Sequence, residues 1–326
     1  MFELLLKLNL QYPITGYASW LMNEKSESIE RTIQTKKILV LGASGMLGHM
    51  LIRVLSSRHQ VVGTTSSIYD KESPLARILS QDNWVDQVDV RNLFTVEEAI
   101  RATNPDVVIN CVGVIKQKME SRNIMDAILI NSLIPHQLAN ICNQIHSRLI
   151  HFSTDCVFDG SPGIKKVNDL PNATDLYGTT KRLGEVDYAP ALTLRTGFVG
   201  RQLSGFEGLF EWVRSQRGKT INGYQNAIYS GFTAMALARI IQQIIEEHDQ
   251  LSGLHQVAGN HINKFDLITK LNEYLDLDLT IIKNTDFMCD RSMDGTEFTK
   301  LTNIPIPSWD DMLAEFATDQ DFYNFN

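Results

Sequence analysis

A glycine turn between an apolar run and a helical pattern constrains this chain most. Residues 37–41 (KILVL) are mostly apolar, as expected of a strand buried in a parallel sheet. Gly42, Gly45 and Gly48 follow with the spacing G-x-x-G-x-x-G, and an amphipathic helical pattern comes next. A second apolar run at residues 61–64 completes a strand, turn, helix and strand within about 30 residues, the size of a βαβ unit. This order predicts a Rossmann-type α/β fold.

The same alternation of strands and helices continues to about residue 200. A third strand is expected to end near Asp89, and the next helix to begin at Thr95, with Glu98 completing a capping box. The alternation predicts a doubly wound parallel sheet with right-handed connections. The remaining segments that we expect are strands at 106–112, 148–153 and 192–195, and helices at 124–145 and 177–188.

We expect three regions along the 326 residues. Residues 1–35 form an N-terminal extension whose residue pattern differs from that of the rest of the chain. Residues 36–200 form a dinucleotide-binding Rossmann domain. Residues 201–326 form a smaller, mainly substrate-binding region, with elements at about 233–258 returning to the Rossmann domain.

Composition excludes several classes of protein. The formal net charge is −8 and there is no Lys/Arg-dense block, so a nucleic-acid partner is not expected. No apolar run reaches the roughly 18 residues that span a bilayer, so we expect no membrane partner and a cytoplasmic location. The four cysteines have neither disulfide-framework nor metal-ligand spacing, which fits a reducing compartment and no metal site.

The glycine turn predicts a ligand as well as a fold. Free backbone N–H groups and the positive end of a helix dipole at such a turn attract a pyrophosphate. NAD-preferring folds place an acidic residue at the end of the second strand, but residues 63–67 (GTTSS) carry none. We therefore expect NADP(H) as the preferred cofactor, with NAD(H) as the alternative. Asp89 and Val90 end the third strand, where an adenine ring would rest.

A second constellation combines Tyr177 and Lys181 with residues 151–155 (HFSTD). Positions i and i+4 share one face of a helix, so a cationic Lys181 would stabilise the phenolate of Tyr177 and lower its pKa. Such a tyrosine can pass a proton to a carbonyl oxygen as hydride arrives at carbon. Thr154 and Asp155 close the fifth strand, at the edge of the sheet where Rossmann-type folds bind ligands.

Together these motifs resemble the extended short-chain dehydrogenase/reductases, and within them the dTDP-4-dehydrorhamnose reductase family. The resemblance spans about residues 36–200 and continues more faintly to the end. It is carried by residues 42–48 (GASGMLG), 108–113 (VINCVG), Asn131, 153–160 (STDCVFDG), 177–185 (YGTTKRLGE) and 194–196 (LRT).

The resemblance implies a role for each matching residue. Tyr177 would be the acid, Lys181 its tuner and a ribose ligand, Thr154 the hydroxyl that orients the carbonyl, and Asp155 would sit beside them. Asn131 would support the lysine. The residues expected to contact the dinucleotide are Gly42, Ser44, Gly45, Met46, Leu47, Gly48, Thr64, Asp89, Val90, Cys111, Val112, Gly113, Asn131, Tyr177 and Lys181.

The reaction implied is reduction of the 4-keto group of a nucleotide-linked 6-deoxy sugar, for surface polysaccharide biosynthesis. Cys156 stands where the family motif has an aromatic residue, and residues 205–232 depart from the rhamnose enzyme's pattern, so the sugar can be dTDP- or UDP-linked. Four basic side chains in this part of the chain could meet the nucleotide phosphates: Arg201, Arg214, Arg217 and Lys219.

Two alternatives share this fold. A nucleotide-sugar epimerase or dehydratase would hold NAD tightly, and a dehydratase would pair an Asp-Glu couple with the tyrosine; here Asp155 is followed by Cys156. A non-catalytic dinucleotide-binding regulatory subunit would not need Thr154, Tyr177 and Lys181 intact. The family also suggests a homodimer formed through helices 124–145 and 177–188.

Overall fold

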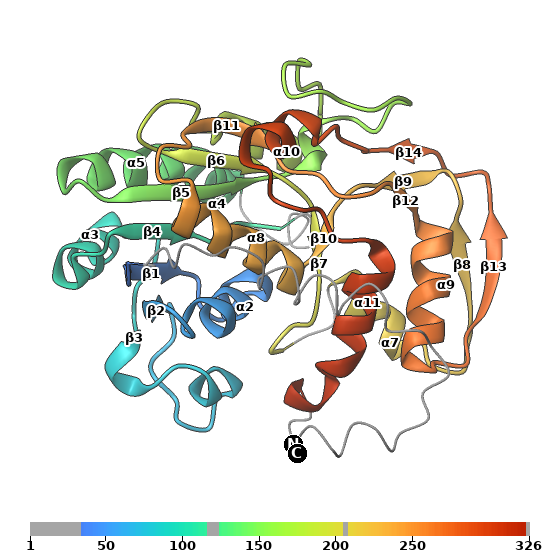
Figure 1. Ribbon diagram of the computed structural model, residues 1–326, viewed down its shortest axis with the longest axis horizontal. Helices are drawn as coiled ribbons and strands as arrows, with labels where there is room; N and C mark the ends of the chain where they lie inside the picture. The colour runs from blue at the N-terminus through green and yellow to red at the C-terminus, as the bar shows by residue number, and fades with distance from the viewer. Residues whose placement is uncertain (1–33, 116–123, 205–207, 324–326) are drawn as a thin grey trace, which may run out of the picture. The chain divides into compact units, whose positions relative to one another are not determined.

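A seven-stranded parallel sheet, on the left in Figure 1, organises the fold. The computed structural model describes residues 34–115, 124–204 and 208–323. The extension expected for residues 1–35 lies outside the described residues apart from its last two. The sheet consists of β1 (Lys37–Leu41), β2 (Gln60–Thr64), β3 (Trp84–Val85), β4 (Val107–Asn110), β5 (Arg148–Ser153), β6 (Leu192–Arg195) and β11 (Gly253–Gln256).

The strand order is that of a doubly wound sheet. It runs β11-β6-β5-β4-β1-β2-β3, and every neighbouring pair is parallel. The order reverses at β1, which lies between β2 and β4, and such a reversal creates a crevice at the carboxyl ends of the strands. The predicted Rossmann-type α/β fold is therefore confirmed.

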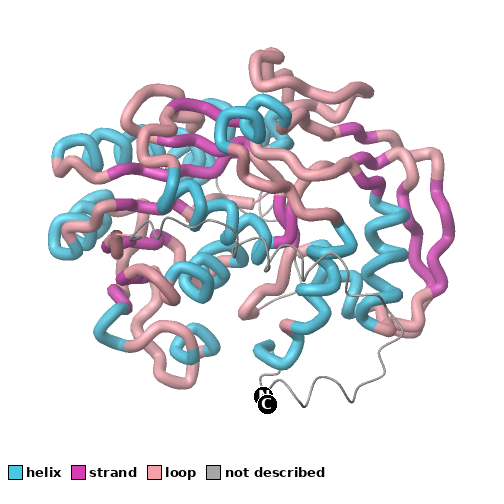
Figure 2. Tube along the Cα trace, in the orientation of Figure 1, coloured by secondary structure: helices cyan, strands magenta, loops and turns pink. Residues whose placement is uncertain are grey.

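Alternating side chains of the strands build two cores, one on each face of the sheet. Ile38 and Val40 pack in one cluster with α2 (Met46–Leu55) and α8 (Ala234–Glu247). Leu39 and Leu41 pack in the other with α3 (Leu93–Thr103) and α5 (Ile134–Gln144). Because successive residues of a strand point to opposite faces, the uninterrupted apolar run requires helices on both sides. Figure 2 shows helices flanking the strands in this way.

The third strand and the helix after it differ from the sequence prediction. β3 ends at Val85, four residues before Asp89, and Gln87 adopts a left-handed conformation (φ 56°) that does not continue a strand. Helix α3 begins at Leu93 with Asn92 as its N-cap, whose side chain accepts from the N–H of Phe94 at 3.3 Å. The predicted cap at Thr95 is wrong because Asn92 offers an equally good acceptor three residues earlier.

The long helix predicted at 124–145 contains one wide turn. α4 (Ile124–Ile128) passes into a π-helical turn (Leu129–Leu133) before α5 begins at Ile134. Pro135 has no N–H to donate to the carbonyl of Asn131, so the regular α-helical bond is missing at this point. π-Turns inside helices often mark functional sites.

The C-terminal half supplies three small sheets. β8 (Thr220–Tyr224) pairs in parallel with β13 (Thr280–Asn284), and β7 (Phe198–Val199) with β10 (Phe232–Thr233). β9 (Ala227–Tyr229) lies between β12 (Ile262–Asn263) and β14 (Cys289–Asp290). The helices of this half, besides α8, are α7 (Leu209–Ser215), α9 (Lys264–Leu275), α10 (Thr296–Thr302) and α11 (Trp309–Thr318). α8 and β11 belong to the main layers, since α8 packs on α2 and β11 pairs with β6.

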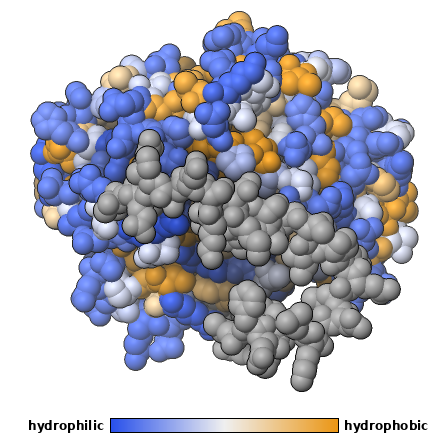
Figure 3. Space-filling model, in the orientation of Figure 1, coloured by the Kyte–Doolittle hydropathy of each residue, from blue (hydrophilic) through white to orange (hydrophobic). Residues whose placement is uncertain are grey.

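Within the described residues, no helix is both long and apolar enough to cross a membrane. The face drawn in Figure 3 is largely hydrophilic, with apolar residues in separate patches.

Candidate active site

The glycine turn brings β1 and α2 into close contact. Gly42 has φ +83°, a left-handed conformation that glycine adopts readily. A Cβ on Gly48 would lie 2.1 Å from the Gly42 carbonyl oxygen, so any side chain there would push α2 away from the strand. α2 starts without a side-chain cap at Gly45 and without an acidic residue in its first turn. Its first N–H groups therefore suit an anion such as a pyrophosphate.

The ends of β2 and β4 adjoin this turn. The carbonyl of Thr64 accepts from the N–H of Ala43 at 2.9 Å, and its hydroxyl from the N–H of Gly42 at 3.4 Å. A Cβ on Gly42 would lie 3.0 Å from a methyl group of Val112. The structure thus brings the turn, Thr64 and the segment Cys111–Gly113 together at the carboxyl ends of three adjacent strands.

Asp89 and Val90 occupy a different environment from the glycine turn. The carboxylate of Asp89 is held by Arg91, with Nη2–Oδ2 at 2.5 Å and Nε–Oδ1 at 3.0 Å. The hydrogen bonds from Arg91 lower the pKa of Asp89. Val90 is 7% exposed and packs in the core on the α3 side. An adenine ring would thus meet an ion pair here and little of the Val90 side chain.

Thr154 and Asp155 lie at the end of β5, as predicted. Thr154 caps a short 3₁₀ turn (Asp155–Val157) by accepting from the N–H of Cys156 at 3.2 Å. Its hydroxyl also lies 3.1 Å from a carboxylate oxygen of Asp155, to which it can donate. Both side chains are buried, so their hydroxyl and carboxylate are held in place beside the strand end.

Tyr177 approaches this turn because α6 (Leu176–Leu183) packs tightly against it. Asp175 caps α6 by accepting from the N–H of Gly178 at 3.0 Å. A Cβ on Gly178 would lie 2.3 Å from the carbonyl oxygen of Cys156, so only glycine allows this approach. Tyr177 then lies within hydrogen-bonding range of Thr154.

Lys181 lies one helical turn after Tyr177 and points to the end of β5. Its Nζ donates to the carbonyl of Phe152 at 2.6 Å. Burial lowers the pKa of Lys181 to about 8, and the nearby charge of Glu185 acts in the opposite direction. The ammonium group of Lys181 is therefore held beside the end of β5, and its lowered pKa lies close to physiological pH.

The pKa of Tyr177 is raised, which corrects the expectation that Lys181 lowers it. Burial is the largest cause, followed by the Cys156 thiol, while the hydrogen bond with Thr154 and the charge of Arg291 act in the opposite direction. Desolvation of the phenolate outweighs the stabilising contacts. The Tyr177 side chain is consequently a neutral phenol at physiological pH and carries a proton that it can donate.

Asn131 connects the segment after β4 to α6. It is fully buried in the π-turn, accepts from the N–H of Val114 at 2.9 Å and donates to the hydroxyl of Thr180 at 3.3 Å. A Cβ on Gly184 would lie 1.9 Å from its carbonyl oxygen, so α6 and the π-turn are in direct contact. Asn131 thereby positions the helix that carries Lys181, and its side-chain hydrogen bonds within the described part of the chain go to Val114 and Thr180.

Sequence reasoning missed two cations from the C-terminal half. Arg291 follows β14, and its Nη1 lies 3.1 Å from the thiol of Cys156. Lys264 begins α9, with its Nζ 4.2 Å from the centre of the Tyr229 ring. Burial lowers the pKa of Lys264, and the charge of Asp155 acts in the opposite direction. These residues stand more than 80 positions from Tyr177 in the sequence, and no motif linked them to it.

Two of the four basic residues expected to meet phosphates are already paired. Arg201 is 6% exposed and bonds Glu211 at 2.6 Å, and Arg214 bonds the same carboxylate at 3.1 Å. The single carboxylate of Glu211 thus engages both guanidinium groups, and a contact of either one with a phosphate stays a prediction. Arg217 and Lys219 remain exposed in the turn between α7 and β8.

The fold and the site define the class of this protein. A doubly wound parallel sheet carries a glycine turn after its first strand, and a threonine, a tyrosine and a lysine meet at the end of its fifth. This is an NAD(P)-dependent oxidoreductase of the short-chain dehydrogenase/reductase type. The chain belongs to the RmlD substrate binding domain family, whose pattern it matches over residues 36–321.

Individual relatives agree with this assignment. A probable low-salt glycan biosynthesis reductase of Haloferax volcanii is 30% identical over 258 residues, which cover 76% of this chain and 82% of that protein. A hypothetical dTDP-4-dehydrorhamnose reductase from Sulfolobus tokodaii has a crystal structure similar to this one. Its TM-score is 0.69, with 27% identity, covering 84% of this chain and 98% of that one.

The fold is also shared with dTDP-4-dehydrorhamnose reductase of Bacillus anthracis, solved in complex with NADP. Its TM-score is 0.71, with 20% identity, covering 87% of this chain and 99% of that one. The resemblance to the reductase family that the sequence indicated is thus confirmed.

Proposed function

We propose that this protein reduces the 4-keto group of a nucleotide-linked 6-deoxy sugar with NAD(P)H, in the cytoplasm, for surface polysaccharide biosynthesis. One arrangement carries the proposal: Tyr177 lies beside Thr154, with Lys181 on the same helix, at the strand ends that also bear the glycine turn. Tyr177 as proton donor would lie next to the crevice where a Rossmann-type fold holds its dinucleotide, which supports the proposal.

The residues divide the chemistry among them. A bound reduced nicotinamide would supply hydride to the carbonyl carbon. The neutral phenol of Tyr177 gives its proton to the carbonyl oxygen, which becomes the hydroxyl of the product. Thr154 donates a hydrogen bond that orients the carbonyl, exchanging its bond to Asp155 for one to the substrate. Lys181 stabilises the phenolate that remains, because its ammonium group is fixed nearby by Phe152.

The proposed preference for NADP(H) rests on the end of β2. Residues 63–67 contain no carboxylate, and the side chains of Ser66 and Ser67 are exposed there. The Thr65 hydroxyl is less available, since it donates to the carbonyl of Ser67 at 2.9 Å and accepts from Trp84 at 2.7 Å. A 2′-phosphate would therefore meet serine hydroxyls without a like charge, and the Bacillus anthracis relative was solved with NADP.

We assign the sugar nucleotide to the region after residue 200, excluding about 233–258, which we place with the Rossmann domain. Lys264 and Arg291 bring positive charge from this region to the edge of the site. The substrate class is a dTDP- or UDP-linked sugar, since such a ligand carries a negatively charged diphosphate.

The proposal is tested by following the hydride. The protein is incubated with NADPH deuterated at the transferred position and with dTDP- and UDP-linked 4-keto-6-deoxy sugars, and the products are examined by NMR. We expect deuterium at C4 of one product. A sugar that is isomerised without gaining deuterium would instead indicate an epimerase. Dinucleotide binding without turnover of any sugar would indicate a regulatory subunit.

A homodimer is part of the proposal, formed through the helices around the π-turn. Apolar side chains there are exposed on the single chain: Ile124 (58%), Met125 (65%), Ile128 (42%), Leu133 (48%) and Leu183 (59%). Exposed apolar side chains gathered on neighbouring helices are typical of an interface. Light scattering would give twice the chain mass, and the double variant Ile124→Asp/Ile128→Asp would give a monomer if this face forms the contact.

A further inference from the structure

The buried imidazole of His49 connects the glycine turn to the C-terminal segment. His49 lies on α2, one turn after Gly45, and is fully buried. Its Nδ1 lies 2.8 Å from the carbonyl oxygen of Gly45, and its Nε2 lies 2.7 Å from the hydroxyl of Tyr323. Tyr323 closes a 3₁₀ turn (Gln320–Tyr323) that follows α11. The ring thus joins two segments 274 positions apart in the sequence.

The contacts fix one tautomer of the ring. A carbonyl oxygen only accepts, so Nδ1 carries the proton that bonds Gly45. Burial lowers the pKa of His49 to about 4, so the ring is neutral near neutral pH and has no second proton. Nε2 is then an acceptor and the hydroxyl of Tyr323 donates to it. The hydroxyl of Tyr323 therefore stabilises the tautomer in which Nδ1 donates to Gly45.

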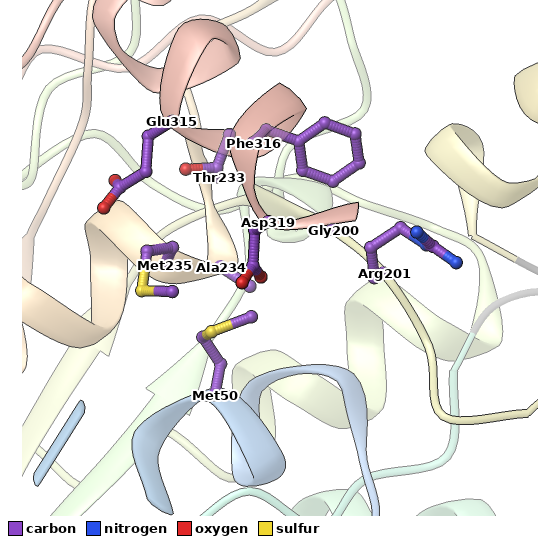
Figure 4. Close-up of a pocket in the computed structure, with 9 residues that line it drawn as sticks. All are labelled: Met50, Gly200, Arg201, Thr233, Ala234, Met235, Glu315, Phe316 and Asp319. Atoms are coloured by element: carbon purple, nitrogen blue, oxygen red, sulfur yellow. The ribbon is translucent and has the colours of Figure 1, made fainter. Parts of the chain in front are cut away.

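Ion pairs and cation–ring contacts hold the C-terminal segment against α2. Arg53 of α2 bonds both carboxylate oxygens of Asp319, at 2.7 and 2.5 Å, and lies 4.0 Å from the centre of the Phe322 ring. Arg201 lies 4.3 Å from the centre of the Tyr323 ring and donates to Gln320 at 2.6 Å. Figure 4 shows Asp319 at the end of α11, directed toward Met50 of α2.

A planar peptide links this contact to the anion-binding end of α2. The carbonyl of Gly45 and the N–H of Met46 belong to one rigid peptide unit, so fixing the direction of one fixes the other. Met46 is the first residue of α2, and its N–H is among those that no side chain caps. The Gly45 carbonyl also accepts the backbone N–H of His49 at 3.1 Å, so the imidazole adds a second hydrogen bond that further restrains how the Met46 N–H faces a pyrophosphate.

We propose that Tyr323, acting through His49, is a positioning residue for the dinucleotide at the glycine turn. The inference rests on the proposed function, because it requires NAD(P) to bind at this turn. It extends the cofactor site to the end of the described chain and gives the C-terminal segment a role in affinity for the dinucleotide.

The test removes one oxygen atom. Tyr323→Phe keeps the ring but loses the donor to Nε2, and NADPH and NADH are titrated into each protein by fluorescence. We expect Kd for the dinucleotide to rise about five- to tenfold, the size expected for one buried hydrogen bond. Affinity for dTDP and UDP should stay within about twofold, because these ligands do not use the turn.

A neighbouring variant separates positioning from general stability. Phe322→Leu removes ring contacts to Arg53 and to Tyr323 but leaves the Tyr323 hydroxyl and its bond to His49, so Kd for the dinucleotide should stay at the wild-type value. If the segment were purely structural, both variants would have a lower melting temperature, and neither would have a higher Kd for the dinucleotide when Kd is measured well below that temperature. Wild-type Kd in Tyr323→Phe overturns the inference and leaves the proposed function intact.

A measurement on the unmodified protein covers the case in which Tyr323→Phe does not fold. Histidine ¹⁵N chemical shifts report which ring nitrogen carries the proton, and we expect His49 to be protonated at Nδ1 alone. A proton on Nε2 alone would overturn the inference without touching the proposed function. Failure of the wild-type protein to bind NADPH or NADH would instead refute the proposed function.

Discussion

Arg195 and Glu185 form a two-point ion pair beneath the candidate active site. Arg195 Nε lies 2.9 Å from one carboxylate oxygen of Glu185, and Nη2 lies 2.8 Å from the other. Arg195 is 1% exposed, and the Ser153 hydroxyl donates to the same carboxylate at 2.6 Å. The pair thus joins the end of β6 to the end of β5, and the charge of Glu185 partly offsets the lowering of the Lys181 pKa by burial.

Breaking this pair should destabilise the protein. Arg195→Ala leaves the Glu185 carboxylate buried without its partner, so the free energy of unfolding should fall by about 3–5 kcal/mol. Urea denaturation measures the change. The exposed pair Arg101–Glu97 is the matched control, and Arg101→Ala should cost less than about 1 kcal/mol. Equal losses in the two variants would contradict the structural role of Arg195.

The pH dependence of reduction should follow Lys181. Its pKa is lowered to about 8, so its ammonium form predominates below that value and is lost as the pH rises through it. Because a cationic Lys181 stabilises the phenolate, kcat/KM for reduction should fall above about pH 8. In Lys181→Arg, whose guanidinium stays charged, this fall should disappear even if the rate is lower. A fall at the same pH in Lys181→Arg would point to another group.

Removing the phenol should affect chemistry and spare binding. Tyr177→Phe lacks the proton donor but keeps the ring, so kcat should drop at least about a hundredfold while Kd for NADPH stays within a few fold. Stopped-flow kinetics and fluorescence titration give the two quantities. Turnover within a few fold of the wild-type rate would exclude Tyr177 as the acid.

The glycine turn should not tolerate a methyl group at Gly48. Gly48→Ala places a Cβ 2.1 Å from the carbonyl oxygen of Gly42, so dinucleotide affinity and thermal stability should both fall. Ser57→Ala is the control, because Ser57 is exposed just after the same helix and its hydroxyl donates to the carbonyl of Val54 at 2.8 Å. Calorimetric titration with NADPH and thermal unfolding compare the two. If Gly48→Ala bound NADPH as tightly as the control variant, the close contact between the turn and α2 would not be needed for dinucleotide binding.

Local sequence patterns predicted the sheet, because a buried strand is a continuous apolar run and an amphipathic helix repeats its apolar residues every three to four positions. The glycine turn and the pair Tyr177–Lys181 were visible for the same reason: their residues are close in sequence. Tyr323, Arg291 and Lys264 were not, since each reaches the site through tertiary packing of elements far from residue 177. The raised pKa of Tyr177 also depends on burial, which spacing alone does not reveal.

The most direct test of the central claim is oxidation of the nicotinamide. Purified protein is mixed with NADPH or NADH and a panel of dTDP- and UDP-linked 4-keto-6-deoxy sugars, and absorbance at the nicotinamide band is followed. We predict that one sugar nucleotide causes loss of this absorbance with the wild-type protein and not with Tyr177→Phe. Absence of both dinucleotide binding and oxidation in the wild-type protein would contradict the account.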